Sequence, residues 1–242
     1  MKAFAEFHSH SNYSGDGKAS MEKMVIEAIN LGYTKYGIPD HGYQNIAYGV
    51  KYTDYPKMRA EMDELKDKYK DSGIQLLLGV EANILDDQGN IDVDDKILQY
   101  VDYVLAGYHF ASKPPDMRGL KNHIRNYTKV FKAKEQDYNT RALINAMKNN
   151  NIFILTHPGD KGDIYTRDVA KAAIETNTIL EINAHHDNLS VKQLLEIKNM
   201  DVKFSVGSDA HKPEHLKYIT KAIDRAQMAG ISSEKIINVK TQ

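Results

Sequence analysis

The sequence predicts a single α/β domain whose parallel strands close into a barrel. Short apolar runs rich in β-branched and aromatic residues alternate with longer amphipathic segments, and this alternation is typical of βα units around a parallel sheet. The chain has 242 residues, and α/β barrels commonly use roughly 200 to 250 residues as one domain. Neither a linker nor an internal repeat divides the sequence, so we expect one domain over residues 1–242.

Seven segments are expected to form the strands. Each is a short run of residues with strong β propensity, bounded by glycine, proline or polar residues. The expected strands cover residues 3–7, 35–38, 75–80, 103–106, 152–155, 179–182 and 202–206.

The segments between these strands are expected to form helices. In residues 21–31, apolar side chains recur at helical spacing, Ser20 is suited to cap the first turn, and Gly32 is suited to end the helix. Residues 113–136 are basic and poorly periodic, so we interpret them as an insertion placed to cover a site. The other expected helices cover residues 55–71, 139–147, 169–175, 191–198 and 216–228.

The composition limits the chemistry that this chain can perform. Cysteine is absent, so thiolate ligands, iron–sulfur clusters and cysteine nucleophiles are excluded, and a metal ion would be held by histidine and carboxylate side chains. Lys plus Arg number 32 and Asp plus Glu number 33, which gives a net charge of -1 and no overall attraction for a nucleic-acid backbone. Nucleic acid is therefore disfavoured as a partner.

The sequence also lacks the marks of a membrane or exported protein. No stretch approaches the ~20 consecutive apolar residues of a transmembrane helix. Near the N-terminus, Glu6 and His8 interrupt the apolar run before it could act as a signal-peptide core. We therefore expect a cytoplasmic protein with no membrane partner, and the sequence leaves its oligomeric state open.

Ionisable and amide side chains follow the expected strands at the point where each strand ends. Because the C-terminal ends of the strands in a parallel barrel open on one face, residues scattered over the sequence would meet in one pocket. In chain order, the strand-end residues are His8 and His10, Asp40 and His41, Glu81, His109, His157, Glu181 and Asn183, and Asp209 and His211.

Two of these pairs have a spacing that suits metal binding. One residue separates His8 from His10, and one separates Asp209 from His211. Side chains alternate along a strand with a period of two, so both members of a pair point to the same side and can reach one ion. A single histidine after a strand is more often a surface residue than a ligand. A ligand-type residue at the end of every expected strand is a much stronger joint signal.

Four other histidines lie off this pattern, and we expect surface or supporting roles for them. Among them, His186 follows an expected strand closely, which leaves a role in the site open for it. The four are His123, His185, His186 and His215.

The motifs at the strand ends resemble those of the PHP (polymerase and histidinol phosphatase) family. The resemblance covers nearly the whole chain, and it implies a distorted seven-stranded (β/α)7 TIM-like barrel with a multinuclear metal site. The tract that begins at Glu81 and is followed by Asp92 is most similar to the small stand-alone phosphatases of the family. The motifs are HSHS (8–11), IPDHG (38–42), GVEAN (79–83), GYH (107–109), THPG (156–159), LEIN (180–183) and GSDAH (207–211).

The resemblance implies ligand sets for three divalent metal ions, with Glu81 as the bridge between the first two. The sequence departs from the family pattern at Asp16, where several single-domain relatives have histidine. A carboxylate can still bind metal there, but the affinity and the preferred ion of the third site stay open. By position, His8, His10, Glu81 and Asp209 would hold the first ion, Glu81, His109 and His157 the second, and Asp16, His41 and His211 the third.

A centre of this kind implies a metal-dependent phosphoesterase that hydrolyses a small phosphomonoester. Two ions that share a carboxylate can also share a water, lower its pKa and direct the resulting hydroxide at phosphorus, so no side-chain nucleophile is needed. Glu81, His157 and Asp209 are the candidate catalytic residues. Histidine and carboxylate ligands suit zinc, manganese or iron, and the sequence does not separate these ions. It does not identify the physiological substrate either.

Five further residues are candidates for supporting roles. Glu181 and Asn183 could position the ligands, because they end an expected strand. Lys113, Arg118 and Lys161 could contact phosphate oxygens, although a solvated surface position is the more common role for each.

Three alternative functions remain open at this level. An amidohydrolase barrel also begins with His-x-His, but its two-metal members typically bridge their ions with a modified lysine, whereas this sequence offers Glu81 and His109. A nuclease of the PHP type is disfavoured by the net charge of -1. A metal-binding module without catalysis is disfavoured because the expected ligand set is complete.

Overall fold

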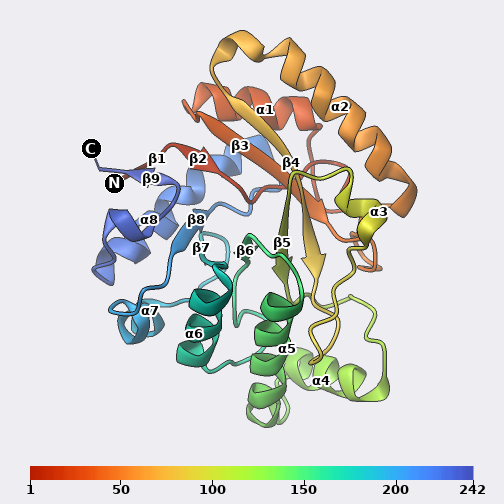
Figure 1. The fold of residues 1–242 in the computed structure, drawn as a ribbon, viewed down its shortest axis with the longest axis vertical. Helices are drawn as coiled ribbons and strands as arrows, with labels where there is room; N and C mark the ends of the chain where they lie inside the picture. Colours follow the sequence, from red (N-terminus) through yellow and green to blue (C-terminus); the bar gives the residue numbers. More distant parts are fainter. Residues whose placement is uncertain (242) are drawn as a thin grey trace.

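The computed structural model describes residues 1–241, and its centre is a sheet of seven parallel strands that curves into a nearly closed barrel (Figure 1). The order of the strands in the sheet follows their order in the chain, so each βα unit adds one neighbouring strand. The α/β barrel predicted from the alternating pattern is therefore confirmed. The seven strands are β2 (Ala5–Glu6), β3 (Lys35–His41), β4 (Gln75–Asn83), β5 (Tyr103–Gly107), β6 (Ile154–Leu155), β7 (Ile179–Asn183) and β8 (Phe204–Gly207).

Closure of the barrel between β2 and β8 relies on a few specific contacts, because no regular ladder joins these two strands in the described part of the chain. At the carboxyl ends, Ser9 and Ala210 form an isolated parallel bridge. At the other end, the side-chain amide of Asn238 donates hydrogen bonds to the backbone oxygens of Ala5 (3.0 Å) and Val206 (2.7 Å). A C-terminal residue thus takes the place of the missing strand-to-strand bonds.

The first expected strand, residues 3–7, was predicted as one element and is two. β1 (Lys2–Ala3) pairs antiparallel with β9 (Val239–Lys240), and only β2 belongs to the barrel. The backbone N–H of Phe4, between the two strands, donates to the carbonyl of Asn238. The partner of β1 lies at the opposite end of the sequence, so local patterning does not reveal the break.

Two strands run further than expected, and this extension matters for the site. β3 continues to His41 and β4 to Asn83, where residues 38 and 80 were the expected ends. In the parallel register between them, His41 lies opposite Glu81. Two predicted site residues therefore sit side by side on adjacent strands, held by the ladder itself.

Helices lie outside the sheet and bury their apolar faces against it (Figure 1). In the first helix, Ser20 accepts a hydrogen bond from the backbone N–H of Lys23, and Gly32 follows the helix with φ of 76°, as expected for a cap and a stop. The structure has no helix, among the residues it describes, with the length and apolar character needed to cross a bilayer. The helices are α1 (Met21–Asn30), α2 (Tyr55–Lys68), α3 (Asp95–Leu98), α4 (Met117–Thr128), α5 (Gln136–Asn149), α6 (Thr166–Thr176), α7 (Val191–Ile197) and α8 (Ile219–Met228).

The insertion at residues 113–136 contains a helix that the apolar pattern did not predict. α4 begins after Asp116, whose carboxylate accepts a hydrogen bond from the backbone N–H of Gly119 at 2.7 Å. Asn122 and Asn126 lie on its buried side, whereas its larger apolar side chains are exposed. Apolar periodicity marks a helix only where the apolar face packs inward, which explains why the poorly periodic segment 113–136 gave no helix signal.

Aromatic side chains fill the barrel interior beneath the strand ends. The ring of Tyr103 lies against Gly37 and Gly79, where an added Cβ would come within 2.1 and 2.5 Å of it. The Tyr103 hydroxyl donates to the backbone oxygen of Phe7 at 2.9 Å, and the two rings pack edge to face. The lower barrel is thus a packed core, and the upper end is free to carry polar side chains.

Candidate metal centre

The structure brings all nine predicted metal ligands together at the carboxyl ends of the strands. Most of them are buried, and all but His8 and His10 line, with neighbouring side chains, a pocket of about 170 Å³. Asp16 and His211 are the more exposed members, with 31% and 24% of their side-chain surface accessible. The nine residues are His8, His10, Asp16, His41, Glu81, His109, His157, Asp209 and His211.

Glu81 lies at the centre of this cluster and is fully buried. Both of its carboxylate oxygens face histidine nitrogens, so two groups of ligands meet at one side chain. Its Oε1 lies 3.1 Å from His157 Nε2, 3.2 Å from His109 Nε2 and 3.3 Å from His8 Nε2, and its Oε2 lies 3.0 Å from His41 Nδ1 and 3.7 Å from His10 Nε2.

Two aspartates complete the acidic part of the cluster. Asp209 Oδ1 lies 3.3 Å from His10 Nε2 and 3.6 Å from His8 Nε2. Asp16 Oδ2 lies 3.3 Å from His41 Nε2 and 3.2 Å from His211 Nε2, so the carboxylate faces both partners that the resemblance gave it.

The backbone is strained at two of these positions. His157 has φ of 28° and Asp209 has φ of 52°, in the left-handed region that non-glycine residues rarely adopt. Such conformations cost about 1–3 kcal/mol each and occur most often at functional sites. The fold therefore accepts strain at two strand ends where predicted ligands enter the pocket.

An outer layer of polar side chains orients the histidines. The carboxylate Oε1 of Glu181 lies 2.6 Å from His8 Nδ1, and Gly207 leaves space for it, because an added Cβ there would approach that oxygen to 2.0 Å. Asn83 Oδ1 lies 3.0 Å from His109 Nδ1. Each contact leaves the Nε2 atom of the ring directed toward Glu81, which is how metal-binding histidines are usually held.

The charges in the cluster suit metal binding. Burial raises the pKa of Glu81, but the neighbouring His109 and His8 outweigh it and hold that pKa well below the usual range. Burial raises the pKa of Asp209 as well, and His8 and His10 likewise hold it low. Burial lowers the pKa of His10 to about 3 and that of His109 to about 4. The carboxylates are therefore ionised and these two imidazoles neutral, the forms that bind cations.

Several buried atoms in the cluster have no hydrogen-bond partner in the described structure. They include both ring nitrogens of His10, Nε2 of His8, Oε2 of Glu81 and Oδ1 of Asp16. Unpaired buried polar atoms are costly and rare in folded proteins. Buried N and O atoms of histidine and carboxylate side chains that face one another without hydrogen-bond partners fit a group of divalent cations, so the residues present are compatible with the metal site that the resemblance implied.

Four triads of the described residues each bring ligand atoms within 4.8 Å of one another. Three overlap with the expected ligand sets but do not reproduce them. The triad with Glu81 and His109 contains His41, where the expected ligand set has His157. The triad with His41 and His211 contains His10, where the expected ligand set has Asp16. The triads are His8, His10 and Asp209; His41, Glu81 and His109; His10, His41 and His211; and His157, His186 and Asp209.

The fourth triad contains a residue that the sequence pattern left outside the site. His186 Nε2 lies 3.4 Å from Asp209 Oδ2, and its Nδ1 lies 3.2 Å from Asp160 Oδ1. Its position on the loop after β7 gives no period-two signal. The sequence left a role in the site open for His186, and the structure places its side chain at the edge of the pocket.

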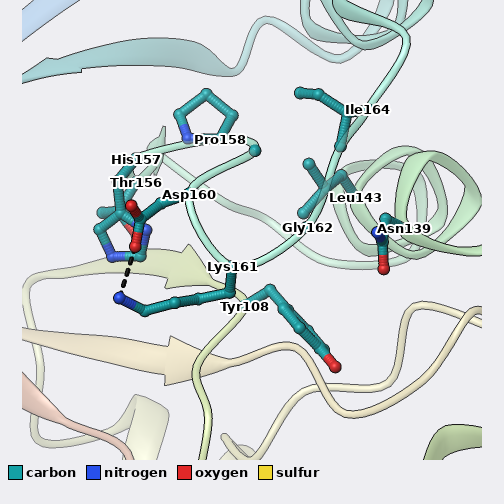
Figure 2. Close-up of a pocket in the computed structure, with 11 residues that line it drawn as sticks. Tyr108, Asn139, Leu143, Thr156, His157, Pro158, Asp160, Lys161, Gly162 and Ile164 are labelled. Carbon is teal, nitrogen blue, oxygen red and sulfur yellow. Dashed lines mark ion pairs between the residues drawn. The ribbon is translucent and has the colours of Figure 1, made fainter. Parts of the chain in front are cut away.

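Of the remaining candidate residues, Lys161 lies at the pocket, whereas Asp40 and Arg118 contact other parts of the structure. Asp40, although at a strand end, accepts hydrogen bonds from the backbone N–H and the hydroxyl of Ser11, and so supports the loop after β2. Arg118 pairs with the buried Glu135 at 2.6 Å, within the insertion. Lys161 lines the pocket of the cluster, and Figure 2 shows its side chain reaching toward Asp160 beside His157.

Comparison with known proteins shows the family to which this chain belongs. The family model described as PHP domain matches residues 6–185. A protein named probable phosphatase from Thermoanaerobacter sp. (strain X514) is 30% identical over 249 residues, which cover 98% of this chain and 91% of that protein. Another probable phosphatase, from Tolumonas auensis, is 31% identical over 184 residues, which cover 76% of this chain and 65% of that protein.

A solved structure with the same fold is the histidinol phosphate phosphatase of Lactococcus lactis, complexed with zinc, L-histidinol and phosphate. It aligns with a TM-score of 0.68 and 18% sequence identity over 95% of both chains. Since the family model spans most of the sequence and relatives match it over nearly its full length, this chain belongs to the PHP domain family.

Proposed function

We propose that this protein is a metal-dependent phosphatase that releases phosphate from a small phosphomonoester at a centre of three divalent ions. Family membership and the phosphatase names of the relatives support the first part of this statement, a metal-dependent phosphoesterase. The number of ions and the size of the substrate are inferred from the cluster and the pocket. The observation that carries the proposal is the buried, ionised Glu81, whose two oxygens face different histidines.

The roles of the residues follow from their positions. When bound, metal ions at such a centre lower the pKa of a water molecule and neutralise charge on the phosphoryl group. Glu81 would bind two of the ions. Asp209 would bind the first ion of that pair, and His157 would bind the second. Asp16, with His41 and His211, would bind a further ion at the more exposed side of the pocket. Glu181 and Asn83 would keep His8 and His109 in place.

A panel assay tests this function. The purified protein, loaded with manganese or zinc, should release inorganic phosphate from an aryl phosphate and from at least one alkyl phosphomonoester. Bis(p-nitrophenyl) phosphate and single-stranded DNA serve as diester substrates, and both should be cleaved far more slowly. Cleavage of DNA ends without monoester hydrolysis would favour a nuclease instead, and hydrolysis of amides alone would favour an amidohydrolase.

Lys161 is expected to contribute to binding of the phosphate group. It lines the pocket among the predicted ligands, and its ammonium group lies beside Asp160 and His157 (Figure 2). The Lys161→Met variant should raise KM for aryl phosphate by about 10-fold or more, because a charge-assisted hydrogen bond is lost. Metal content should not change. Lys171→Met, at an exposed position on α6 where the lysine pairs with Asp168, is the matched control and should leave KM unaltered.

The insertion is expected to govern the choice of substrate more than the chemistry. It follows His109 closely in the chain, and loops on the carboxyl face of a barrel set specificity. Replacing residues 116–135 with a short glycine–serine linker removes Arg118 and Arg125 together with their shared partner Glu135, so no buried charge is left unpaired. The ranking of substrates should then change while metal content stays the same. Loss of metal would instead make the segment part of the site.

A further inference from the structure

His186 is held in the way that a metal ligand is held. One ring nitrogen, Nδ1, faces the carboxylate of Asp160 at 3.2 Å, and the other, Nε2, faces the carboxylate of Asp209 at 3.4 Å. The side chain is 21% exposed and Asp209 is nearly buried, so the contact lies at the rim of the cluster. Histidine ligands typically donate the second ring N–H to a carboxylate or carbonyl while the first binds the ion.

Two predicted ligands show the same arrangement. His8 has Nδ1 at 2.6 Å from Glu181 Oε1 and Nε2 at 3.3 Å from Glu81 Oε1. His109 has Nδ1 at 3.0 Å from Asn83 Oδ1 and Nε2 at 3.2 Å from the same Glu81 oxygen. In all three histidines an outer oxygen fixes one nitrogen, and the other is directed at a central carboxylate.

The loop that carries His186 is fixed by its backbone. The side-chain oxygen of Asn183 accepts hydrogen bonds from the backbone N–H groups of His185 (2.8 Å) and His186 (3.0 Å). Arg225 donates to the carbonyls of Asn183 and His186, both at 2.9 Å. A ring on such a loop is held in advance for one position, as a metal ligand requires.

Asp160 is supported in turn. Its carboxylate pairs with Lys161 through Oδ2, whereas its Oδ1 faces His186 Nδ1. One carboxylate oxygen is therefore available to accept the N–H of His186 Nδ1. Figure 2 shows Asp160 on the loop just after His157, which is itself a predicted ligand.

We infer that His186 binds one of the divalent ions of the centre through Nε2, with His157 and Asp209 as its companions and Asp160 as the orienting carboxylate. These three ligands bring donor atoms within 4.8 Å of one another. The Asp209 oxygen that faces His186, Oδ2, is not the one that faces His8 and His10, which is Oδ1. Asp209 could therefore bind one ion through Oδ1 and another through Oδ2. Imidazole nitrogens and a carboxylate suit zinc, iron or manganese better than magnesium or calcium.

This inference rests on the proposed metal centre, and metal affinity tests it apart from catalysis. The stripped protein is titrated with zinc against a chromophoric chelator, and its visible absorption is recorded after loading with cobalt. In His186→Ala, the affinity for one ion should fall at least ~10-fold and the cobalt absorption should change. In Asp160→Asn, the affinity for the same ion should also fall, on the ~10- to 100-fold scale that is typical of residues that orient a ligand.

His185→Ala is the matched control. The residue adjoins His186, with ring centroids 4.9 Å apart, but none of the ligand triads in the described chain includes it. Zinc affinity and the cobalt spectrum should not change in this variant. Thermal unfolding of all metal-free variants shows whether the fold is intact, and His186→Asn serves as a second substitution if the alanine variant unfolds.

The outcomes separate the two proposals. Wild-type zinc affinity and an unchanged cobalt spectrum in folded His186→Ala would overturn the inference while leaving the phosphatase function intact. A raised KM with unchanged metal binding would make His186 a substrate contact and would equally overturn it. If Glu81→Gln also keeps its metal, the proposed centre itself fails.

Discussion

The Glu81→Gln variant is expected to lose at least ~100-fold in phosphatase rate together with part of its bound metal. The carboxylate faces nitrogens of five histidines through both oxygens, and it is ionised in spite of complete burial. Glutamine keeps the shape but removes the charge, and its amide has only one good ligand atom. A lost electrostatic contact of this kind usually costs a factor of ~100 or more in kcat. Metal content per chain and kcat on an aryl phosphate measure the effect.

The fold should survive this substitution, because the barrel core is built from apolar side chains below the site. Circular dichroism and the melting temperature of the metal-free variant check this. Glu64→Gln makes the same chemical change at an exposed position on α2 and should alter neither metal content nor rate. If Glu81→Gln kept full metal and full rate, the assignment of the bridge would be wrong.

Removal of metal is expected to abolish activity completely. In the proposed mechanism no side chain attacks the phosphorus, so hydrolysis requires the ions that the buried imidazoles and carboxylates around the pocket would hold. Dialysis against a chelator should reduce phosphate release to background, and manganese or zinc should restore it. The rate should rise from acidic pH to a neutral or alkaline optimum, because the attacking water must lose a proton.

Two controls accompany the metal-removal experiment. Magnesium alone should restore activity poorly, since the site is rich in imidazole nitrogen and magnesium prefers oxygen ligands. After treatment with the chelator and restoration of metal, circular dichroism should show the same content of helix and strand as in the untreated protein. Undiminished phosphate release from fully stripped enzyme would exclude the proposed mechanism.

The sequence was sufficient to predict that the candidate residues lie together, because the strand ends of a parallel barrel open on one face. His8, Glu81 and Asp209 are far apart in the chain, but each lies at or near the carboxyl end of an apolar strand, and the structure brings them together. The barrel and the family were predicted and are confirmed. The metal-binding roles of the individual residues remain predictions.

What the sequence did not reveal depended on distant contacts. The end of β1 is set by β9 at the other terminus, and closure of the barrel is completed by Asn238. α4 was missed because polar residues face inward and apolar ones outward. His186 lies off the strand-end pattern, and the carboxylate that contacts it, Asp160, lies on another loop. In each case the structure depends on contacts that the local sequence pattern does not contain.

The most direct test of the metal centre is a titration of stripped wild-type protein with zinc or manganese, in which bound metal per chain and phosphatase rate are measured on the same samples. The proposed centre predicts that phosphate release stays at background until metal binds and reaches its maximum only when more than one ion is bound per chain. Maximal phosphate release from protein that holds no metal would contradict the central claim.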